Sequence, residues 1–157
     1  DSFSGEQLLE MYWAGSLAVK LNHTVDEEEV NVHRDTYLLV GTPTPLGYMT
    51  ELVDNGVTAF YRGGSHRWGQ TVDIVVDFEE ATWAGQWDGS MNGNNMDFSA
   101  TGQVTGQHIY STNIIDADSG YVQGTFFGGE AEALGGGYEV NKGGVTQGDV
   151  FTTRKLE

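Results

Sequence analysis

From Gly56 onward, apolar and polar residues alternate along most of the chain. In residues 71–78, Val72 and Ile74 share one face of an extended segment while Asp73 lies on the other. This two-residue period is the pattern of a strand with one buried face. Turn residues separate eight such segments at intervals of about 8 to 12 residues, which is typical of sandwiches and barrels. The predicted strands cover residues 57–62, 71–78, 83–91, 96–104, 107–114, 121–127, 134–141 and 149–154.

These segments predict an all-β fold with an eight-stranded antiparallel up-and-down β-barrel. Closure of the barrel removes the exposed strand edges that favour aggregation. Asn92-Gly93, between the third and fourth segments, is a two-residue hairpin signal. The interior of an eight-stranded barrel is either filled by side chains or holds one small ligand. Large apolar residues at inward positions favour a filled interior, namely Trp83, Trp87, Met91, Phe98, Phe126 and Tyr138.

Residues 1–55 lack this regular pattern and are predicted to form an N-terminal extension that packs on the barrel of residues 56–155. Within the extension, Ser4-Gly5-Glu6-Gln7 fits a capping box, which predicts one short helix in residues 1–15. The last two residues, Leu156-Glu157, are interpreted as the remnant of a cloning vector.

Two strands are predicted to complete the extension. They cover residues 17–21 and 30–40, and the acidic run of residues 26–29 joins them. Pro43 and Pro45 then interrupt the pattern, because proline lacks an amide donor and biases the residue before it to extended geometry. We therefore expect residues 42–56 to form a proline-containing connection.

The charge of the chain restricts its partners. The 157 residues include 23 Asp and Glu against 7 Lys and Arg, a formal net charge of −16 at pH 7. This charge argues against nucleic acid and against an anionic membrane surface, and it leaves basic partners open. No apolar run reaches the roughly 18 to 20 residues of a membrane helix, so no membrane span is predicted. The chain has no Cys, which excludes disulfides and thiolate catalysis.

Segment 124–136 carries a family resemblance. It reads GTFFGGEAEALGG and resembles the barrel signature of transferrin-binding protein B and its relatives, roughly G-x-F-[FY]-G-P-x-A-x-E-[LIV]-G-G. Three segments that precede it, FYRG (residues 60–63), VDF (76–78) and TWAG (82–85), occur in the same order as in that family. Gly129 and Ala133 depart from the signature, which usually has Pro and Glu at these positions. The resemblance covers about residues 56–155.

The resemblance implies a barrel of the kind found in surface lipoproteins and secreted haemophores of Gram-negative bacteria. Members of that family bind transferrin, complement factor H, haemoglobin or haem. A cell-surface location as an outer membrane lipoprotein, with a lipid anchor upstream of this sequence, or secretion is therefore expected. The signature itself is architectural, because its glycines permit turns and close packing and identify no ligand.

Four residues of one apparent hairpin loop are the first candidates for ligand or partner binding: Arg62, His66, Arg67 and Trp68. Arginine and tryptophan are enriched among interface anchors, and imidazole is a common ligand of haem iron. The alternative interpretation is that His66 is an ordinary turn residue and that Trp68 tucks its ring over the barrel mouth.

Three further candidates lie in the predicted extension: His33, Tyr48 and Met49. Tyr48 and Met49 follow the two prolines and would offer a phenol and a thioether to haem iron if that segment reached over a barrel opening. Ordinary packing of the segment against the barrel is the alternative. No metal site is predicted, because the carboxylate-rich segments 26–29 and 116–118 complete no EF-hand pattern.

These observations lead to one functional hypothesis and two alternatives. No nucleophile elbow, phosphate loop or zinc-protease helix is present, so no enzyme and no catalytic residue is predicted. We expect an exported binding protein whose loops capture a host or environmental iron source, either haem or a haem or iron carrier protein, with haem as the candidate cofactor. The first alternative is a structural or adhesion module of a larger cell-surface protein with no small ligand. The second is a lipocalin-like carrier with an apolar pocket inside the barrel.

Overall fold

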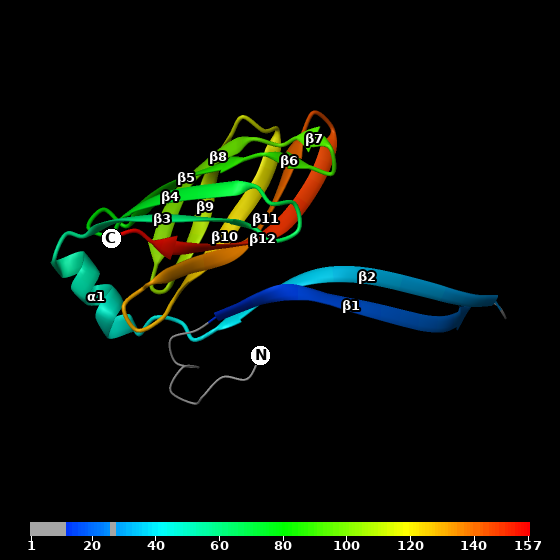
Figure 1. Ribbon diagram of the computed structural model, residues 1–157, viewed down its shortest axis with the longest axis horizontal. Helices are drawn as coiled ribbons and strands as arrows, with labels where there is room; N and C mark the ends of the chain where they lie inside the picture. The colour runs from blue at the N-terminus through cyan, green and yellow to red at the C-terminus, as the bar shows by residue number, and fades with distance from the viewer. Residues whose placement is uncertain (1–11, 26–27) are drawn as a thin grey trace.

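The computed structural model describes the backbone of residues 12–25 and 28–157 and the side chains from residue 41 onward. Its main body is a closed barrel of eight strands, in agreement with the predicted fold class (Figure 1). The barrel strands are β3 (Thr58–Ser65), β4 (Thr71–Asp77), β5 (Thr82–Asp88), β8 (Phe98–Thr105), β9 (His108–Ile115), β10 (Ser119–Phe127), β11 (Ala133–Lys142) and β12 (Val145–Lys155).

The barrel is an antiparallel up-and-down meander. Each strand pairs with the next along the chain, and β12 closes the barrel by pairing with β3 between Phe151↔Ser65 and Lys155↔Tyr61. The narrowest seam joins β9 and β10, where only the pairs from Tyr110↔Gln123 to His108↔Thr125 are formed. Every barrel strand is therefore paired with a neighbour on both sides over at least part of its length, as expected for the predicted closed barrel.

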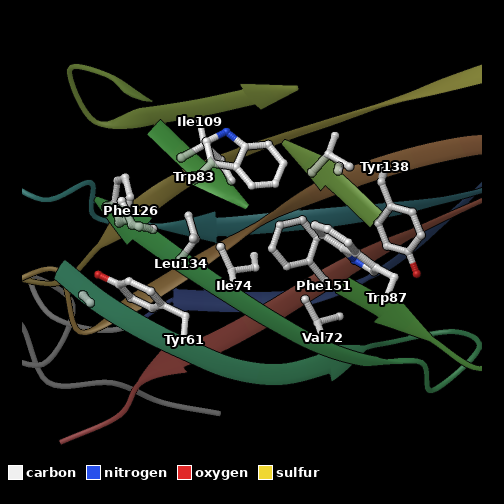
Figure 2. Close-up of a cluster of buried hydrophobic side chains, with 14 of the residues drawn as sticks. Tyr61, Val72, Ile74, Trp83, Trp87, Ile109, Phe126, Leu134, Tyr138 and Phe151 are labelled. Carbon is white, nitrogen blue, oxygen red and sulfur yellow. The ribbon is translucent and has the colours of Figure 1, made fainter. Parts of the chain in front are cut away.

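The interior of the barrel is filled by its own aromatic rings (Figure 2). The ring of Trp87 stacks on Phe98 with centroids 5.0 Å apart and meets the edge of Phe151 at 5.5 Å. Gly85 makes room for this indole, since a Cβ there would lie 2.7 Å from the Trp87 ring. The six residues predicted to point inward are all buried. This packing agrees with the filled interior and argues against the lipocalin-like alternative.

A short helix closes one end of the barrel. Helix α1 (Leu46–Asp54) begins after Pro45 and buries Met49 and Leu52 against the core. The sequence analysis expected a connection here and did not predict its helix, although a proline at the start of a helix loses no intrahelical hydrogen bond. The helix expected in residues 1–15 is not supported where it can be checked, because residues 12–15 belong to a strand and residues 1–11 lie outside the described part.

The opposite end, here called the loop end, is closed by side chains from several turns. A small hairpin of β6 (Ser90–Met91) and β7 (Asn94–Asn95) turns at Asn92-Gly93, the position that the sequence predicted. The strands on either side of it are shorter than expected, because the chain leaves β5 at Gly89, whose φ is +134°. Met91 and Met96 are nevertheless fully buried and plug this end.

A two-stranded ribbon precedes α1. Strands β1 (Tyr12–Val25) and β2 (Glu28–Gly41) pair antiparallel from Tyr12↔Gly41 to Val25↔Glu28, and they contain the two predicted N-terminal strands. Both contact β12, and Figure 1 shows the ribbon running away from the barrel. Among the described residues, no helix is both long and apolar enough to cross a membrane.

Candidate binding surface

The connection between β3 and β4, residues 66–70, is held in place by one buried carboxylate of a neighbouring strand. Asp149 of β12 is 6% exposed. Its oxygens accept the backbone N–H of Arg67 at 3.0 Å and that of Trp68 at 2.9 Å, in addition to the N–H of Val150 at 2.7 Å. Hydrogen bonds to a charged acceptor are stronger than neutral ones. The loop backbone is therefore held in one shape by a residue more than 80 positions away in the sequence.

The side chains of this loop combine a cation, an indole and an imidazole. The Arg67 guanidinium lies over the Trp68 ring, with Cζ 4.4 Å from the ring centroid. Trp68 is half-buried against the core, and its buried Nε1 has no hydrogen-bond partner among the described residues. His66 is exposed, and its Nε2 lies 2.9 Å from Oγ1 of Thr152. The loop thus presents His66 and Arg67 outward while Trp68 partly covers the barrel mouth.

The buried side-chain amide of Gln70 connects this loop to the segment between β5 and β8. Gln70 is fully buried, and its Nε2 donates to the carbonyl oxygens of Gly89 at 3.0 Å and Met96 at 3.1 Å. The Tyr138 hydroxyl donates to the Gln70 side-chain oxygen. Burial raises the pKa of Tyr138, so this phenol stays protonated as a donor. Two adjacent loops at the loop end are consequently tied to one buried network.

Arg62 lies apart from the loop. The loop is shorter than predicted, because β3 extends to Ser65 and places Arg62 in the middle of a strand. Its Nε donates to Asp73 Oδ1 at 2.6 Å, and both side chains are well exposed. Arg62 therefore lies on the outer wall of the barrel, whereas His66, Arg67 and Trp68 lie together at its end.

The remaining sequence-predicted candidates are at other places. Met49 is 5% exposed and packs in the core, as the packing alternative had it. Tyr48 lies at the α1 end, where partial burial, followed by the carboxylates of Glu130 and Glu132, raises the pKa of its phenol. The backbone of His33 lies in β2 opposite Lys20, and its side chain lies outside the described part. The structure therefore does not bring Tyr48 or Met49 close to His66.

Several grooves on the surface of the barrel were missed by the sequence analysis. One of about 540 Å³ lies across β3, β4, β5 and β8 and is lined by Phe60, Val75, Ala84 and Ile115 among others. A second of about 450 Å³ lies over β9–β12 on a floor rich in glycine. Strand alternation could have indicated the first, because Tyr61 faces the core and its neighbour Phe60 must then face outward.

No metal centre accompanies these surfaces in the part of the chain that the structure describes, since no three His, Asp or Glu side chains gather there. The fold defines the class of protein: an eight-stranded antiparallel meander barrel with a filled interior and with grooves on its outside.

The family follows from a direct match. Residues 40–155 match the family model described as the C-lobe and N-lobe beta barrels of Tf-binding protein B. The chain belongs to this family, and the resemblance of segment 124–136 is confirmed. A comparison with curated protein sequences gave no match.

Solved structures share the fold. Intact Ap-TbpB, with N and C lobes, is similar with a TM-score of 0.55 at 16% identity, over 88% of this chain and 38% of that chain. A mutant of the vaccine antigen Transferrin Binding Protein B from Haemophilus parasuis Hp5 is similar with a TM-score of 0.59 at 18% identity, over 88% of this chain and 37% of that one. The chain thus spans less than two fifths of these relatives, and the likeness concerns the fold alone.

Proposed function

We propose that this protein is a non-enzymatic binding protein, exported to the cell surface as a lipoprotein or secreted, that captures an iron source from a host or the environment. The observation that carries the proposal is the filled interior of a barrel that belongs to the Tf-binding protein B family. Because the rings of its own core occupy the barrel, a ligand has to be recognised from outside. The related structures are named as transferrin-binding proteins, so an iron carrier protein is the first partner to test.

The loop of residues 66–70 is the recognition element in this proposal. Asp149 fixes its backbone, and the stacking of Arg67 on Trp68 orders a long side chain before a partner arrives. Ordering in advance reduces the entropy lost on binding. A guanidinium in a chain of net charge −16 is also a distinct local feature that a carboxylate or carbonyl group of a partner can recognise.

Biosensor binding measurements test the carrier-protein form of this proposal. The immobilised protein is exposed to iron-loaded transferrin, iron-free transferrin and haemoglobin. We expect saturable binding of one of them and at least about a tenfold loss of affinity in Arg67→Ala, as for an interface anchor. Lys155→Ala is the matched control, because it removes the same charge at the opposite end of the barrel. Equal affinities of the two variants would exclude the loop as the recognition element.

Haem capture is tested separately with haemin and absorption spectra. If haem is the ligand, the Soret band shifts on mixing, and His66→Ala or His33→Ala abolishes the shift. His108→Ala is the matched control, because its imidazole is also exposed and also meets a threonine hydroxyl at 2.9 Å. If neither haemin nor any carrier protein binds, the proposal fails, and the alternative of a structural or adhesion module without a small ligand takes its place.

A further inference from the structure

The 540 Å³ groove lies on the outer wall between two exposed apolar side chains. Phe60 of β3 is 57% exposed on one margin, and Ile115 of β9 is 41% exposed on the other. The pairing register gives the floor between them, since Val75 lies opposite Phe60 and Ala84 lies opposite Val75. Val75 and Ala84 are only half-buried. A prominent aromatic ring thus lies beside a shallow apolar hollow on the same face.

The charges of this groove cancel. The charged side chains that line it are Arg62 and Asp73, which pair with each other at 2.6 Å. The whole chain carries a net charge of −16. Two copies of so acidic a chain repel each other, and the local repulsion is smallest where they meet through residues whose charges cancel, as in this groove.

A two-fold axis makes such a face complementary to itself. In a symmetric dimer every contact occurs twice. If one residue of the first copy contacts another residue of the second copy, the same two residues also meet with the copies exchanged. Phe60 of one copy can enter the hollow over Val75 and Ala84 of the other, and the reverse contact forms at the same time. Arg62 and Asp73 can likewise exchange partners across the axis. The aromatic ring of one copy therefore fits the hollow of the other, and the guanidinium of one copy fits the carboxylate of the other, so a second copy of this chain is a complementary partner.

We propose that this groove on the outer wall of β3, β4, β5 and β8 is the docking site through which two copies of this chain form a weak symmetric dimer. The groove is smaller than standard stable interfaces, which involve about 20 to 30 residues a side. We therefore expect a dissociation constant above about 1 µM, which corresponds to weak association. This proposal does not depend on the proposed function, since it concerns a different face of the barrel.

Analytical ultracentrifugation over a range of concentrations tests the proposal. We expect a monomer–dimer equilibrium whose dimer fraction rises with added salt, because salt screens the repulsion between acidic copies but not an apolar contact. A chain that stays monomeric at all concentrations and salt levels overturns the proposal. Leu156 also lines the groove and was interpreted as a vector remnant, so the measurement is repeated on the chain ending at Lys155, which we expect to dimerise as well.

Substitutions locate the contact. Phe60→Ser should weaken dimerisation at least about tenfold, as for an aromatic anchor. Tyr121→Ser is the matched control, because it removes an aromatic ring with 48% exposure from a strand outside this groove. Both side chains are exposed, so neither change threatens the core. A dimer that Tyr121→Ser weakens as much as Phe60→Ser does contradicts the assigned face.

The ion pair provides an independent measurement. Arg62→Asp and Asp73→Arg each place like charges on both sides of the axis, so each variant alone should dimerise less than the original chain. An equimolar mixture of the two should recover association, because each copy then offers the charge that the other lacks. Circular dichroism verifies that both variants keep the fold. A mixture that behaves as the sum of its two components refutes the exchange of partners across the axis.

Discussion

Replacing Asp149 with alanine should loosen the loop that carries His66, Arg67 and Trp68. The carboxylate is 6% exposed and accepts the N–H groups of Arg67 and Trp68. Alanine removes the carboxylate, so the loop amides of Arg67 and Trp68 lose their acceptor, and the amide of Val150 loses the same acceptor. The perturbation therefore acts on the candidate binding loop and on the stability of the fold together.

The loop's share of the magnitude follows from the hydrogen bonds to Arg67 and Trp68. A hydrogen bond to a charged group contributes about 1.5 to 3 kcal/mol. Water reaches Arg67, which is exposed, so the lower end of this range applies to each amide. Asp149→Ala should therefore lower the free energy of unfolding by at least about 3 kcal/mol. In a domain of this size the melting temperature should fall by about 10 °C, because 1 kcal/mol corresponds to about 2 to 4 °C.

Two measurements distinguish a local effect from a global one. Urea unfolding gives the change in the free energy of unfolding, and an unchanged slope excludes a change in the unfolded state. Hydrogen exchange then reports on the amides of Arg67 and Trp68 directly. We expect both amides to lose protection by a larger factor than the global destabilisation explains, since the loop opens before the barrel does.

Asp97→Ala is the matched control for this substitution. The Asp97 carboxylate accepts a single backbone N–H, that of Gly89, at 2.6 Å. Its removal should cost about 1.5 kcal/mol and should leave the exchange of the Arg67 amide unchanged. If Asp149→Ala costs no more than Asp97→Ala and the loop amides stay protected, then Asp149 does not hold the loop, and the reasoning is refuted.

Two further predictions concern glycine substitutions and the buried tyrosines. Gly136→Ala should cost about 3 kcal/mol, because its Cβ would lie 1.9 Å from the backbone oxygen of Gln123. Gly47→Ala, in α1 with nothing near the added Cβ, should raise stability by about 0.5 kcal/mol, and calorimetry that gives both changes the same sign contradicts this. Burial raises the pKa of Tyr61 and Tyr138 above the ordinary 10.0, so the protonated phenols stabilise the fold below pH 10 and this stabilisation is lost as the pH rises further. In an alkaline titration their tyrosinate absorbance should appear only with unfolding, and the Tyr61→Phe/Tyr138→Phe double variant should lack that cooperative step.

The eight barrel strands could be predicted because each has one face on the core. Where the inward residues are large and the outward residues polar, as in residues 71–78, the predicted and observed bounds differ by one residue. Where small residues dominate, the alternation is weak and strands were predicted too short. The first part of β12, residues 145–148, was missed in this way, because Gly148 and two polar residues show no clear period.

The helix and the shape of the loop illustrate two different limits. Helix α1 had a readable signal, since Met49 and Leu52 are three residues apart and follow a proline, but the two prolines were taken only as breakers. The hydrogen bond from the Arg67 backbone N–H to the Asp149 carboxylate had no such signal in the sequence. It joins residues 82 positions apart, and in so acidic a chain one more aspartate is not distinctive.

The same division separates family from function. The signature residues act inside the barrel: Phe126 packs on Tyr61 and Phe78 with ring centroids 5.8 and 5.4 Å apart, and Gly136 lets two strands approach where any side chain would collide. In this chain these residues close the barrel, and none of these contacts depends on what the protein binds. The outward positions between them, and the loops, are free to differ without a cost to closure. A family match therefore fixes the scaffold, and the partner has to be sought at residues that the signature leaves out, such as Arg67 on the loop and Phe60 on the wall.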